Sequence, residues 1–377
     1  MTGPAATSCR VPRILFVGKR FYTNKDALLE QFGRMYWLPF GWARSGVDLL
    51  LWLIDYHTRS RVQAKIPFRI LSTPLLSFSM LQGLYAALRF RPTVIVASGD
   101  SYIGLLGWML AKLLGARFVF DVYDKYDEFD GYRNFFGWDS FAFLRRKADL
   151  KTFCSVALQQ AYACEGSGGG SVLVANGVDQ TQFRPLDRSE CRAAVGLETA
   201  GSLLGYFGSM EPDRGVADLI GAVELLRFRG LDLRVLICGK EHPATKLDRD
   251  WIIYRGAVPH ADMPLYLGAA DVLVVPYRQS PIMDMGASCK IAEYLMCGRP
   301  IVSTRTGNFV NNFPLQASAL KEGLCDAADP VDMARAIQHQ LRTPILVPAP
   351  ENMKWSSIAS DALQAIVALE REVESPC

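Results

Sequence analysis

Strand-length apolar runs alternate with helix-length segments along most of the chain. Within these runs the apolar residues are consecutive, a pattern typical of parallel strands that are covered on both faces. In the first half the predicted strands are 13–18, 47–54, 68–71, 93–97, 118–122, 151–154 and 171–175, and the predicted helices are 26–44, 75–89 and 102–114. The alternation therefore predicts a parallel sheet with helices on both faces.

The pattern starts again after a glycine-rich break at 166–170 and a turn-rich segment at 176–185. The predicted strands of the second half are 203–207, 233–238, 252–255, 272–275 and 300–303, and its helices are 189–195, 216–229, 263–269, 288–297, 331–341 and 355–372. We expect an N-terminal tail at 1–12, a first α/β domain at 13–188, a second at 189–350 and a last helix within 351–377. Two domains are also what a length of 377 residues favours.

The composition of the chain argues against several classes of function. The formal net charge of +3 is too small to indicate nucleic-acid binding. The nine cysteines have no metal-binding spacing and the four histidines do not cluster, so we expect reduced cysteines, a cytoplasmic location and no metal or other cofactor. Residues 1–12 lack the apolar stretch of a signal peptide. The most apolar helix candidate, 102–114, is shorter than the roughly 20 residues that span a bilayer.

Residues 208–215 (GSMEPDRG) follow a predicted strand and precede a predicted helix. In open α/β sheets, ligands bind beyond the carboxyl ends of the strands, and the amides at a helix start favour an anion. Gly208 and Ser209 lie at that strand end, and Arg214 could bind a phosphate there. A solvated arginine in an ordinary turn remains the alternative.

Residues 286–293 (GASCKIAE) form a second candidate. The small residues Gly286, Ala287 and Ser288 would let a ligand approach the backbone at a helix start. Lys290 and Glu293 are neighbours on one helix face, so one could bind phosphate and the other ribose hydroxyls. The alternative is a surface ion pair, which contributes under about 1 kcal/mol.

Two further strand ends carry weaker signals. Gly239 follows the strand 233–238 and leaves room for a ligand or for a tight turn. Tyr123 and Asp124 follow the strand 118–122, where an acidic group could position an acceptor hydroxyl or face a developing positive charge. A polar loop is the alternative. No dinucleotide-binding Gly-x-Gly-x-x-Gly follows the first strand, and no Walker loop or nucleophile elbow is present.

In order along the chain, these segments resemble glycosyltransferase family 4, whose members have the two-domain GT-B fold. The resemblance is carried by 176–179 (NGVD), 207–216 (FGSMEPDRGV), 256–260 (GAVPH) with 269–276 (AADVLVVP), and 290–302 (KIAEYLMCGRPIV), and it extends from about Ile14 to Leu369. It implies two Rossmann-like domains that face each other across a cleft, with a C-terminal helix that crosses back to the first domain.

The resemblance also implies roles for individual residues. Arg214 would contact the donor diphosphate, Glu293 would hold the ribose, and the amides from Gly286 to Ser288 would meet phosphate. Lys290 stands where relatives of the polysaccharide type carry a lysine. Gly208, Ser209, Ala287 and Gly239 complete the expected donor site, and Asp124 with Tyr123 is the candidate catalytic pair.

Three departures from the family pattern limit the expectation. Ser209 replaces a common arginine, Met285 stands where many members have a first glutamate, and Tyr123 is near the place of a common histidine. They leave open a non-catalytic binding protein of the same fold. A sugar-nucleotide epimerase of that fold is the other alternative, although its histidine and acid constellation is not evident.

The implied activity is transfer of a hexose-type sugar from a UDP- or GDP-sugar to a hydroxyl of a glycan or lipid-linked acceptor, in cell-surface polysaccharide or glycolipid synthesis. The family implies retention of configuration, and we expect no metal requirement and no nucleic-acid partner. Basic and aromatic residues at 34–44 and 78–91, and the basic run 145–147, could rest on an anionic membrane at the inner face of the plasma membrane. The alternative is core packing with a solvated edge.

Overall fold

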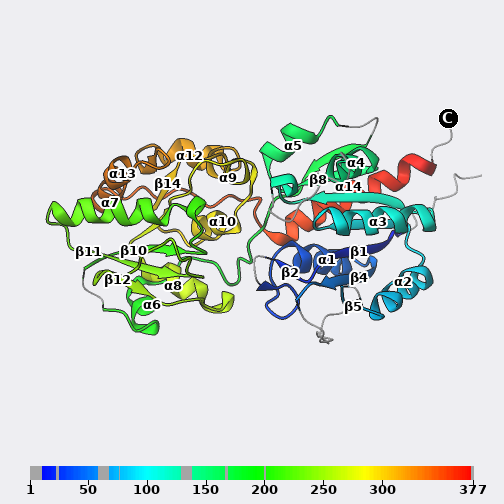
Figure 1. Ribbon diagram of the computed structural model, residues 1–377, viewed down its shortest axis with the longest axis horizontal. Helices are drawn as coiled ribbons and strands as arrows, with labels where there is room; N and C mark the ends of the chain where they lie inside the picture. Colours follow the sequence, from blue (N-terminus) through cyan, green and yellow to red (C-terminus); the bar gives the residue numbers. More distant parts are fainter. Residues whose placement is uncertain are drawn as a thin grey trace, which may run out of the picture.

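The computed structural model describes residues 11–22, 25–57, 68–75, 77–128, 138–165, 169–198 and 201–374. It contains two α/β domains side by side, each built around a parallel sheet (Figure 1). The predicted fold class is thereby confirmed. Most of the expected tail at 1–12 and part of the glycine-rich break at 166–170 lie outside the described residues.

The first sheet has seven parallel strands in the order β5-β4-β1-β6-β7-β8-β9. They are β1 (Arg13–Lys19), β4 (Asp48–Asp55), β5 (Arg69–Pro74), β6 (Val94–Ser98), β7 (Arg117–Val122), β8 (Leu150–Phe153) and β9 (Gly170–Leu173). A small antiparallel ladder joins β2 (Phe21–Tyr22) to β3 (Lys25–Asp26). The central strands are buried over nearly their whole length, which explains their consecutive apolar residues.

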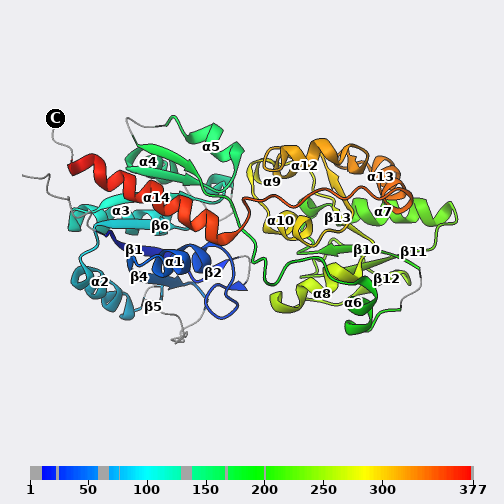
Figure 2. The same ribbon diagram turned by 180° about the vertical axis from the view of Figure 1, so that it is seen from behind.

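The helices of this domain are α1 (Arg34–Arg44), α2 (Ser79–Phe90), α3 (Ser101–Leu114), α4 (Ser140–Lys147) and α5 (Val156–Tyr162), with a 3-10 turn η1 (Tyr126–Glu128). Helix α1 begins eight residues later than predicted. Asp26 is instead paired with β2 and bound to Arg20, and Gly33 has a positive φ of 69° immediately before the helix. Helices α2 and α3 cover one face of the sheet, and α1 covers the other (Figures 1 and 2).

The second sheet has six strands in the order β12-β11-β10-β13-β14-β15. They are β10 (Ser202–Phe207), β11 (Leu233–Cys238), β12 (Ile252–Tyr254), β13 (Val272–Val275), β14 (Ile301–Thr304) and β15 (Leu324–Cys325). Its helices are α6 (Arg188–Ala194), α7 (Val216–Phe228), α8 (Met263–Ala269), α9 (Pro281–Met285), α10 (Cys289–Met296), α11 (Gly307–Val310), α12 (Pro314–Ala319) and α13 (Pro330–Arg342), with 3-10 turns η2 (Pro212–Arg214), η3 (His260–Asp262) and η4 (Lys321–Gly323). The expected division at 188/189 falls at the start of α6, which packs against α8.

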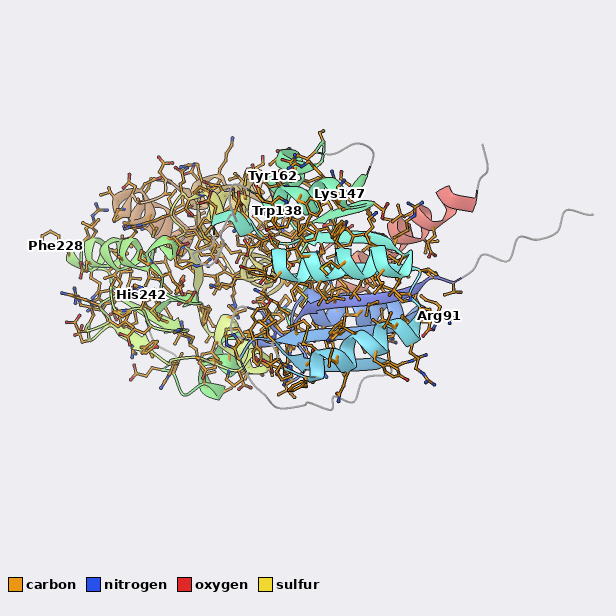
Figure 3. All side chains as sticks on the ribbon, turned by 45° about the vertical axis from the view of Figure 1, so that its right-hand side comes forward. Arg91, Trp138, Lys147, Tyr162, Phe228 and His242 are labelled. Atoms are coloured by element: carbon orange, nitrogen blue, oxygen red, sulfur yellow. The ribbon has the colours of Figure 1, made fainter. Side chains whose placement is uncertain are left out.

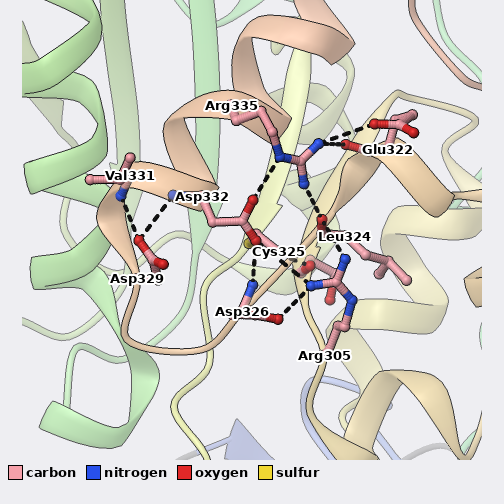
Figure 4. Close-up of polar contacts among 10 residues, drawn as sticks. Arg305, Glu322, Leu324, Cys325, Asp326, Asp329, Val331, Asp332 and Arg335 are labelled. Carbon is pink, nitrogen blue, oxygen red and sulfur yellow. Dashed lines mark hydrogen bonds and ion pairs between the residues drawn. The ribbon is translucent and has the colours of Figure 1, made fainter.

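A charged network ties α13 to the ends of β14 and β15 (Figure 4). Asp332 accepts hydrogen bonds from the amide of Asp326 at 2.8 Å and from Arg335 Nε at 2.6 Å. Arg335 also donates to the carbonyl of Leu324, and Arg305 pairs with Asp326. Because these bonds reach backbone groups at the sheet edge, they fix the position of α13 more firmly than isolated surface pairs would.

Helix α14 (Trp355–Glu374) returns to the first domain and lies along α1 (Figure 2). Trp42 Nε1 on α1 donates to the carbonyl of Ala359 at 2.8 Å. A Cβ placed on Gly41 would lie 2.6 Å from the Cβ of Ala359, so the glycine allows the two helices to approach closely. The predicted crossover helix is confirmed. None of the helices in the described part of the chain is long and apolar enough to cross a bilayer.

The chain passes between the domains twice, once before α6 and once before α14. The two crossings run beside each other, since the amide of Val178 donates to the carbonyl of Met353 at 2.7 Å. The domains are therefore connected by a pair of adjacent segments.

Candidate functional site

The predicted donor residues gather beyond the carboxyl ends of the second sheet. Gly208 follows β10 and Gly239 follows β11, with φ values of 151° and 144°. A Cβ on Gly239 would overlap the carbonyl oxygen of Gly208, so these two turns pack backbone against backbone. These two turns lie at the edge where ligands of open α/β sheets bind, which is called the strand-end edge below.

Lys290 on α10 reaches the strand-end edge. A Cβ on Gly208 would overlap the Nζ of Lys290, so the ammonium group lies directly against that glycine. The same Nζ lies 5.7 Å from the ring centre of Tyr206 and 5.8 Å from that of Tyr277. Among the described residues Lys290 has no ion-pair partner.

Arg214 approaches the same tyrosine from the other side. Its guanidinium carbon lies 5.4 Å from the ring centre of Tyr277. Its Nε is buried without a hydrogen-bond acceptor in the described part of the chain, and the nearest carboxylates, Glu211 and Asp213, are 3.8 Å away. Burial opposes ionisation of Tyr277, yet the charges of Lys290 and Arg214 lower the pKa of its hydroxyl. The positive charge around Tyr277 therefore favours an anion at the strand-end edge.

Ser209 does not replace the missing arginine charge. Its carbonyl accepts a hydrogen bond from the hydroxyl of Tyr206 at 2.5 Å. Burial alone would raise the pKa of Glu211, but a hydrogen bond with the Ser209 side chain and the charge of Arg214 lower it. Ser209 therefore supports the charge of an acidic residue, Glu211, beside the strand-end edge.

The amides of the small-residue loop before α10 are partly engaged within the protein. The amide of Gly286 donates to the carbonyl of Ile282 at 2.9 Å, and that of Ser288 donates to Asn308 Oδ1 at 2.8 Å. A phosphate could use these two amides only by displacing the existing bonds. The first amides within α10 are better placed for an anion, because a helix start leaves them without intrahelical acceptors.

Glu293 points away from Lys290. It is buried, and its Oε1 lies 2.9 Å from Nε2 of His260. The alternative of a surface Lys290–Glu293 pair is therefore wrong. The His260 ring is held by Phe32 of the first domain, 4.8 Å between ring centres, and by Phe183 at 5.1 Å.

Sequence reasoning missed two residues beside Glu293. His260 was part of a family motif without a role, and Lys25 was not singled out. Burial lowers the pKa of Lys25, and the charge of Glu293 acts in the opposite direction. Nothing in the local sequence connects Lys25 on β3 with Glu293 on α10, since only the contact between the domains brings them together.

Asp124, in the first domain, faces the second. Burial is the main reason that its pKa rises from 3.8 to about 6, and the positive charges of Arg214 and Lys19 partly oppose this rise. Lys19 itself pairs with Asp100, with Nζ 2.6 Å from Oδ2. Asp124 is thus a carboxyl group whose protonated form is favoured by burial and whose charged form is favoured by Arg214 across the domains.

Tyr123 occupies a different environment from its neighbour Asp124. It is buried in the core of the first domain, and its ring centre lies 5.5 Å from that of Tyr126. Burial raises the pKa of its hydroxyl well above the ordinary value. This placement corrects the expectation of a Tyr123–Asp124 catalytic pair, because a packed core tyrosine is poorly placed to exchange protons with a substrate.

Arg34 links the first domain to the donor loop. Its buried guanidinium donates to both carboxylate oxygens of Asp121, at 2.8 and 2.7 Å, and to Asn176 Oδ1 at 2.9 Å. Asn176 Nδ2 then donates to the carbonyl of Ala287 at 2.8 Å. The chain of contacts runs from β7 to the loop before α10.

Two more hydrogen bonds join the domains nearby. Ser155 Oγ donates to the carbonyl of Met285 at 2.5 Å, and the amide of Val156 donates to Asn312 Oδ1 at 3.1 Å. The start of α5 therefore contacts the loop between α9 and α10. The loop that contains Gly286–Ser288 is therefore held by hydrogen bonds from Ser155 and Asn176, and its role in donor binding stays a prediction.

The structure corrects one membrane candidate. Arg34, Met35, Tyr36 and Trp42 of the 34–44 stretch are buried, and α14 covers this helix. Arg145 of the 145–147 run is also buried. These residues serve packing and cannot rest on a membrane. No group of three or more His, Cys, Asp or Glu side chains in the described ranges could hold a metal ion.

Part of the chain matches the model of a known protein family. Residues 201–343 match the family model described as Glycosyl transferases group 1. The D-inositol 3-phosphate glycosyltransferase of Mycolicibacterium gilvum is 27% identical over 199 residues, which cover 47% of this chain and 44% of that protein. The lipopolysaccharide core biosynthesis mannosyltransferase LpsB of Rhizobium meliloti is 25% identical over 187 residues, covering 46% and 49%. These matches span less than half of either relative.

Solved structures are similar over nearly the whole chain. Sucrose-phosphate synthase from Thermosynechococcus elongatus has a TM-score of 0.68 at 16% identity, covering 96% of this chain and 97% of that one. The Anabaena protein HepE in complex with UDP-glucose has a TM-score of 0.61 at 14% identity, covering 96% and 98%. The resemblance inferred from the sequence is confirmed. The chain has the GT-B fold of glycosyltransferases, and its residues 201–343 are similar to the family Glycosyl transferases group 1.

Proposed function

We propose that this protein is a glycosyltransferase that moves a hexose-type sugar from a UDP- or GDP-sugar to a hydroxyl group of a glycan or lipid-linked acceptor. The observation that carries the proposal is the pair of cations around Tyr277. Lys290 lies against Gly208 without an ion-pair partner in the described residues, and Arg214 has a buried Nε without an acceptor there. A diphosphate supplies the missing negative charge and acceptors.

The relatives support this class of donor and acceptor. LpsB is named as a mannosyltransferase of lipopolysaccharide core synthesis, and HepE was crystallised with UDP-glucose. By analogy, the nucleotide-sugar would lie on the second domain and the acceptor on the first. The product would then belong to a cell-surface polysaccharide or a glycolipid.

In the proposed reaction the donor bond breaks between the sugar carbon and the diphosphate. Arg214, Lys290 and the amides at the start of α10 stabilise the charge that develops on the leaving group. Asp124 faces the same region from the first domain, where it can accept a hydrogen bond from an acceptor hydroxyl or from the sugar. We propose a retaining reaction that needs no metal, because side-chain cations already face the leaving group.

Donor binding and turnover test the proposal directly. A panel of UDP- and GDP-sugars is screened by thermal shift, and the stabilising donor is then titrated calorimetrically. Arg214→Ala and Lys290→Ala should each weaken binding about tenfold or more, since hydrogen bonds to charged groups contribute about 1.5–3 kcal/mol. Turnover should persist in EDTA. Wild-type donor affinity in both variants would refute the site.

A glycine pair provides a matched control. Gly208→Ala should weaken donor binding like Lys290→Ala, because the new methyl group displaces the ammonium. Gly230 also has a positive φ, 86°, but a Cβ there meets no atom within 4 Å. Gly230→Ala should therefore share the backbone strain and leave the donor affinity unchanged.

A binding protein that holds a nucleotide-sugar without transferring it is the second candidate. The burial of Tyr123 in the first-domain core favours it, because one candidate catalytic group is then absent from the cleft. Tight donor binding with no transfer and no donor hydrolysis, across a panel of acceptors, would identify this function.

A further inference from the structure

Helix α2 carries an exposed apolar stripe. Its members recur at intervals of three and four residues, so they share one side of the helix. They are Phe78, Leu81, Tyr85 and Leu88, which are 91%, 62%, 62% and 45% exposed. The opposite side is packed, since a Cβ on Gly83 would overlap the ring of Trp52. The stripe is therefore additional to the face that α2 buries against its own sheet.

Helix α3 carries a second stripe. Tyr102, Met109 and Leu113 are 51%, 61% and 70% exposed, and their spacing of seven and four again selects one side of the helix. Both helices cover the same face of the first sheet (Figures 1 and 3). Large exposed apolar groups on adjacent elements are typical of a binding surface rather than of isolated surface residues.

The charges of this face have one sign. Neither α2 nor α3 contains Asp or Glu. Arg89 and Lys112 are exposed on them, and Arg91 is exposed immediately after α2, at the edge of the first domain in Figure 3. Apolar side chains flanked by basic ones match the interface of an anionic bilayer, where the rings and aliphatic groups enter the headgroup region and the cations meet phosphate.

A second copy of the chain fits this face less well. In a two-fold contact the same surface lies opposite itself. The basic residues Arg89, Arg91 and Lys112 of both copies would then gather at one contact, with no acidic group within either helix to neutralise them. Charge complementarity therefore selects a negatively charged partner.

The face also leads toward the cleft. Tyr102 is two residues from Asp100, the N-cap of α3, and Asp100 pairs with Lys19. A lipid whose headgroup carries an acceptor hydroxyl could thus lie along α3 and present that hydroxyl near Asp124.

We infer that the face formed by α2 and α3, defined by Phe78, Leu81, Tyr85, Leu88, Tyr102, Met109 and Leu113, docks the protein on an anionic membrane. Delivery of a lipid-linked acceptor by this face rests on the proposed function. The docking itself does not, because it needs only the surface.

Vesicle co-sedimentation tests the docking. The full chain is mixed with vesicles of phosphatidylcholine alone or with phosphatidylglycerol added, at low and high salt. Binding is expected only with phosphatidylglycerol and should decrease with salt. Arg89→Glu combined with Arg91→Glu should weaken it about tenfold or more, since each basic residue near the surface contributes about 1 kcal/mol. Leu81→Ser combined with Tyr85→Ser should also weaken it.

The controls lie on the second domain. Phe228 on α7 is 93% exposed and Arg229 follows it, so Phe228→Ser combined with Arg229→Glu changes polarity and charge in the same way elsewhere. This control should bind vesicles like the wild type. Absence of vesicle binding, or an equal loss in the control, would overturn the inference. So would a dimer in sedimentation experiments that the Leu81 and Tyr85 variant abolishes, because the face would then be a self-association surface.

Donor affinity separates this inference from the proposed function. The α2 variants should bind the soluble nucleotide-sugar with wild-type affinity, which also shows that they fold. If the protein binds the nucleotide-sugar but not the vesicles, only the inferred membrane docking is refuted. If the protein binds the vesicles but no nucleotide-sugar, only the proposed glycosyltransferase function is refuted.

Discussion

Arg34, which is fully buried, and Arg214, which is partly buried, show two different environments for a guanidinium group. A buried guanidinium is costly unless its donors are paired. Arg34 donates to Asp121 and Asn176, and its contacts hold two domains together. Arg214 leaves Nε without a hydrogen-bond acceptor in the described ranges, and its nearest carboxylates, Glu211 and Asp213, are 3.8 Å away. The first arginine is paired at hydrogen-bond distance, whereas the second has only loose ion pairs and one donor left over.

Asp124 makes a pH-dependent prediction. Its pKa in the folded protein is about 6, above its ordinary value of 3.8, so the folded state holds the proton more tightly than the unfolded state. Stability should therefore fall as pH rises from about 4 to about 6 and stay lowered above that. Asp124→Asn should unfold like the wild type at pH 4 and be about 1–3 kcal/mol more stable at pH 7.5.

Urea unfolding at the two pH values measures this difference. Asp232→Asn, at a mostly exposed carboxylate, controls for general effects of acid. A stability difference between Asp124→Asn and the wild type that is the same at both pH values would show that the Asp124 carboxyl is not perturbed by folding.

Gly208 and Gly239 were accessible to sequence reasoning because each follows a buried strand. Arg214 lies in the turn before a helix, so strand ends alone indicated a common edge. Tyr277 also follows a strand, β13, but was not singled out, whereas His260 and Lys25 could not be found in this way. Their roles depend on side chains that meet only after the second sheet and the domain contact have formed.

At the level of elements, the sheets were predictable and one helix was misinterpreted. Strand β1 was expected at 13–18 and occupies Arg13–Lys19, because a doubly covered strand is apolar throughout. Helix α1 was considered a membrane candidate for its aromatic and basic residues. Its amphipathic pattern was real, but the segment that covers it, α14, comes more than 300 residues later. Amphipathicity shows that a face is buried without showing by what.

The close contact between α1 and α14 predicts that a glycine-to-alanine substitution in α1 destabilises the protein instead of stabilising it. Glycine to alanine in a helix normally stabilises it by about 0.5–1 kcal/mol. Gly41→Ala should instead destabilise the protein by about 1–3 kcal/mol, because the methyl group would lie 2.6 Å from the Cβ of Ala359. Chemical denaturation measures the change.

A double-mutant cycle isolates that contact. Ala359→Gly removes the opposing methyl group, so Gly41→Ala in that background should recover most of the lost stability. If the two substitutions were simply additive, close packing of α14 on α1 at this point would be refuted.

At the scale of the molecule, hydrogen bonds near the loop before α10 form one part of the contact between the domains, and the packing of Phe32 on His260 forms another. Such bonds can be exchanged for bonds to water at modest net cost, so the contact is suited to opening and closing. Helix α5 and the loop before α10 are the parts held this way, through Ser155, Val156 and Asn312.

Amide hydrogen exchange tests that contact at a single position. The amide of Val156 donates to Asn312 Oδ1, so Asn312→Ala should make it exchange faster by about tenfold. Asn311→Ala removes the neighbouring exposed side chain and should leave the rate unchanged. Equal rates in both variants and the wild type would show that this contact does not form in solution.

The return of α14 to the first domain has a practical consequence for observing movement. Val11, at the start of the described chain, and α14, at its end, belong to the same half of the molecule. A pair of spectroscopic labels on these two segments would keep a constant separation while the halves turn against each other. Arg91 and Phe228 stand at opposite ends of the long axis (Figure 3), and labels placed there would register the turn as a change in distance.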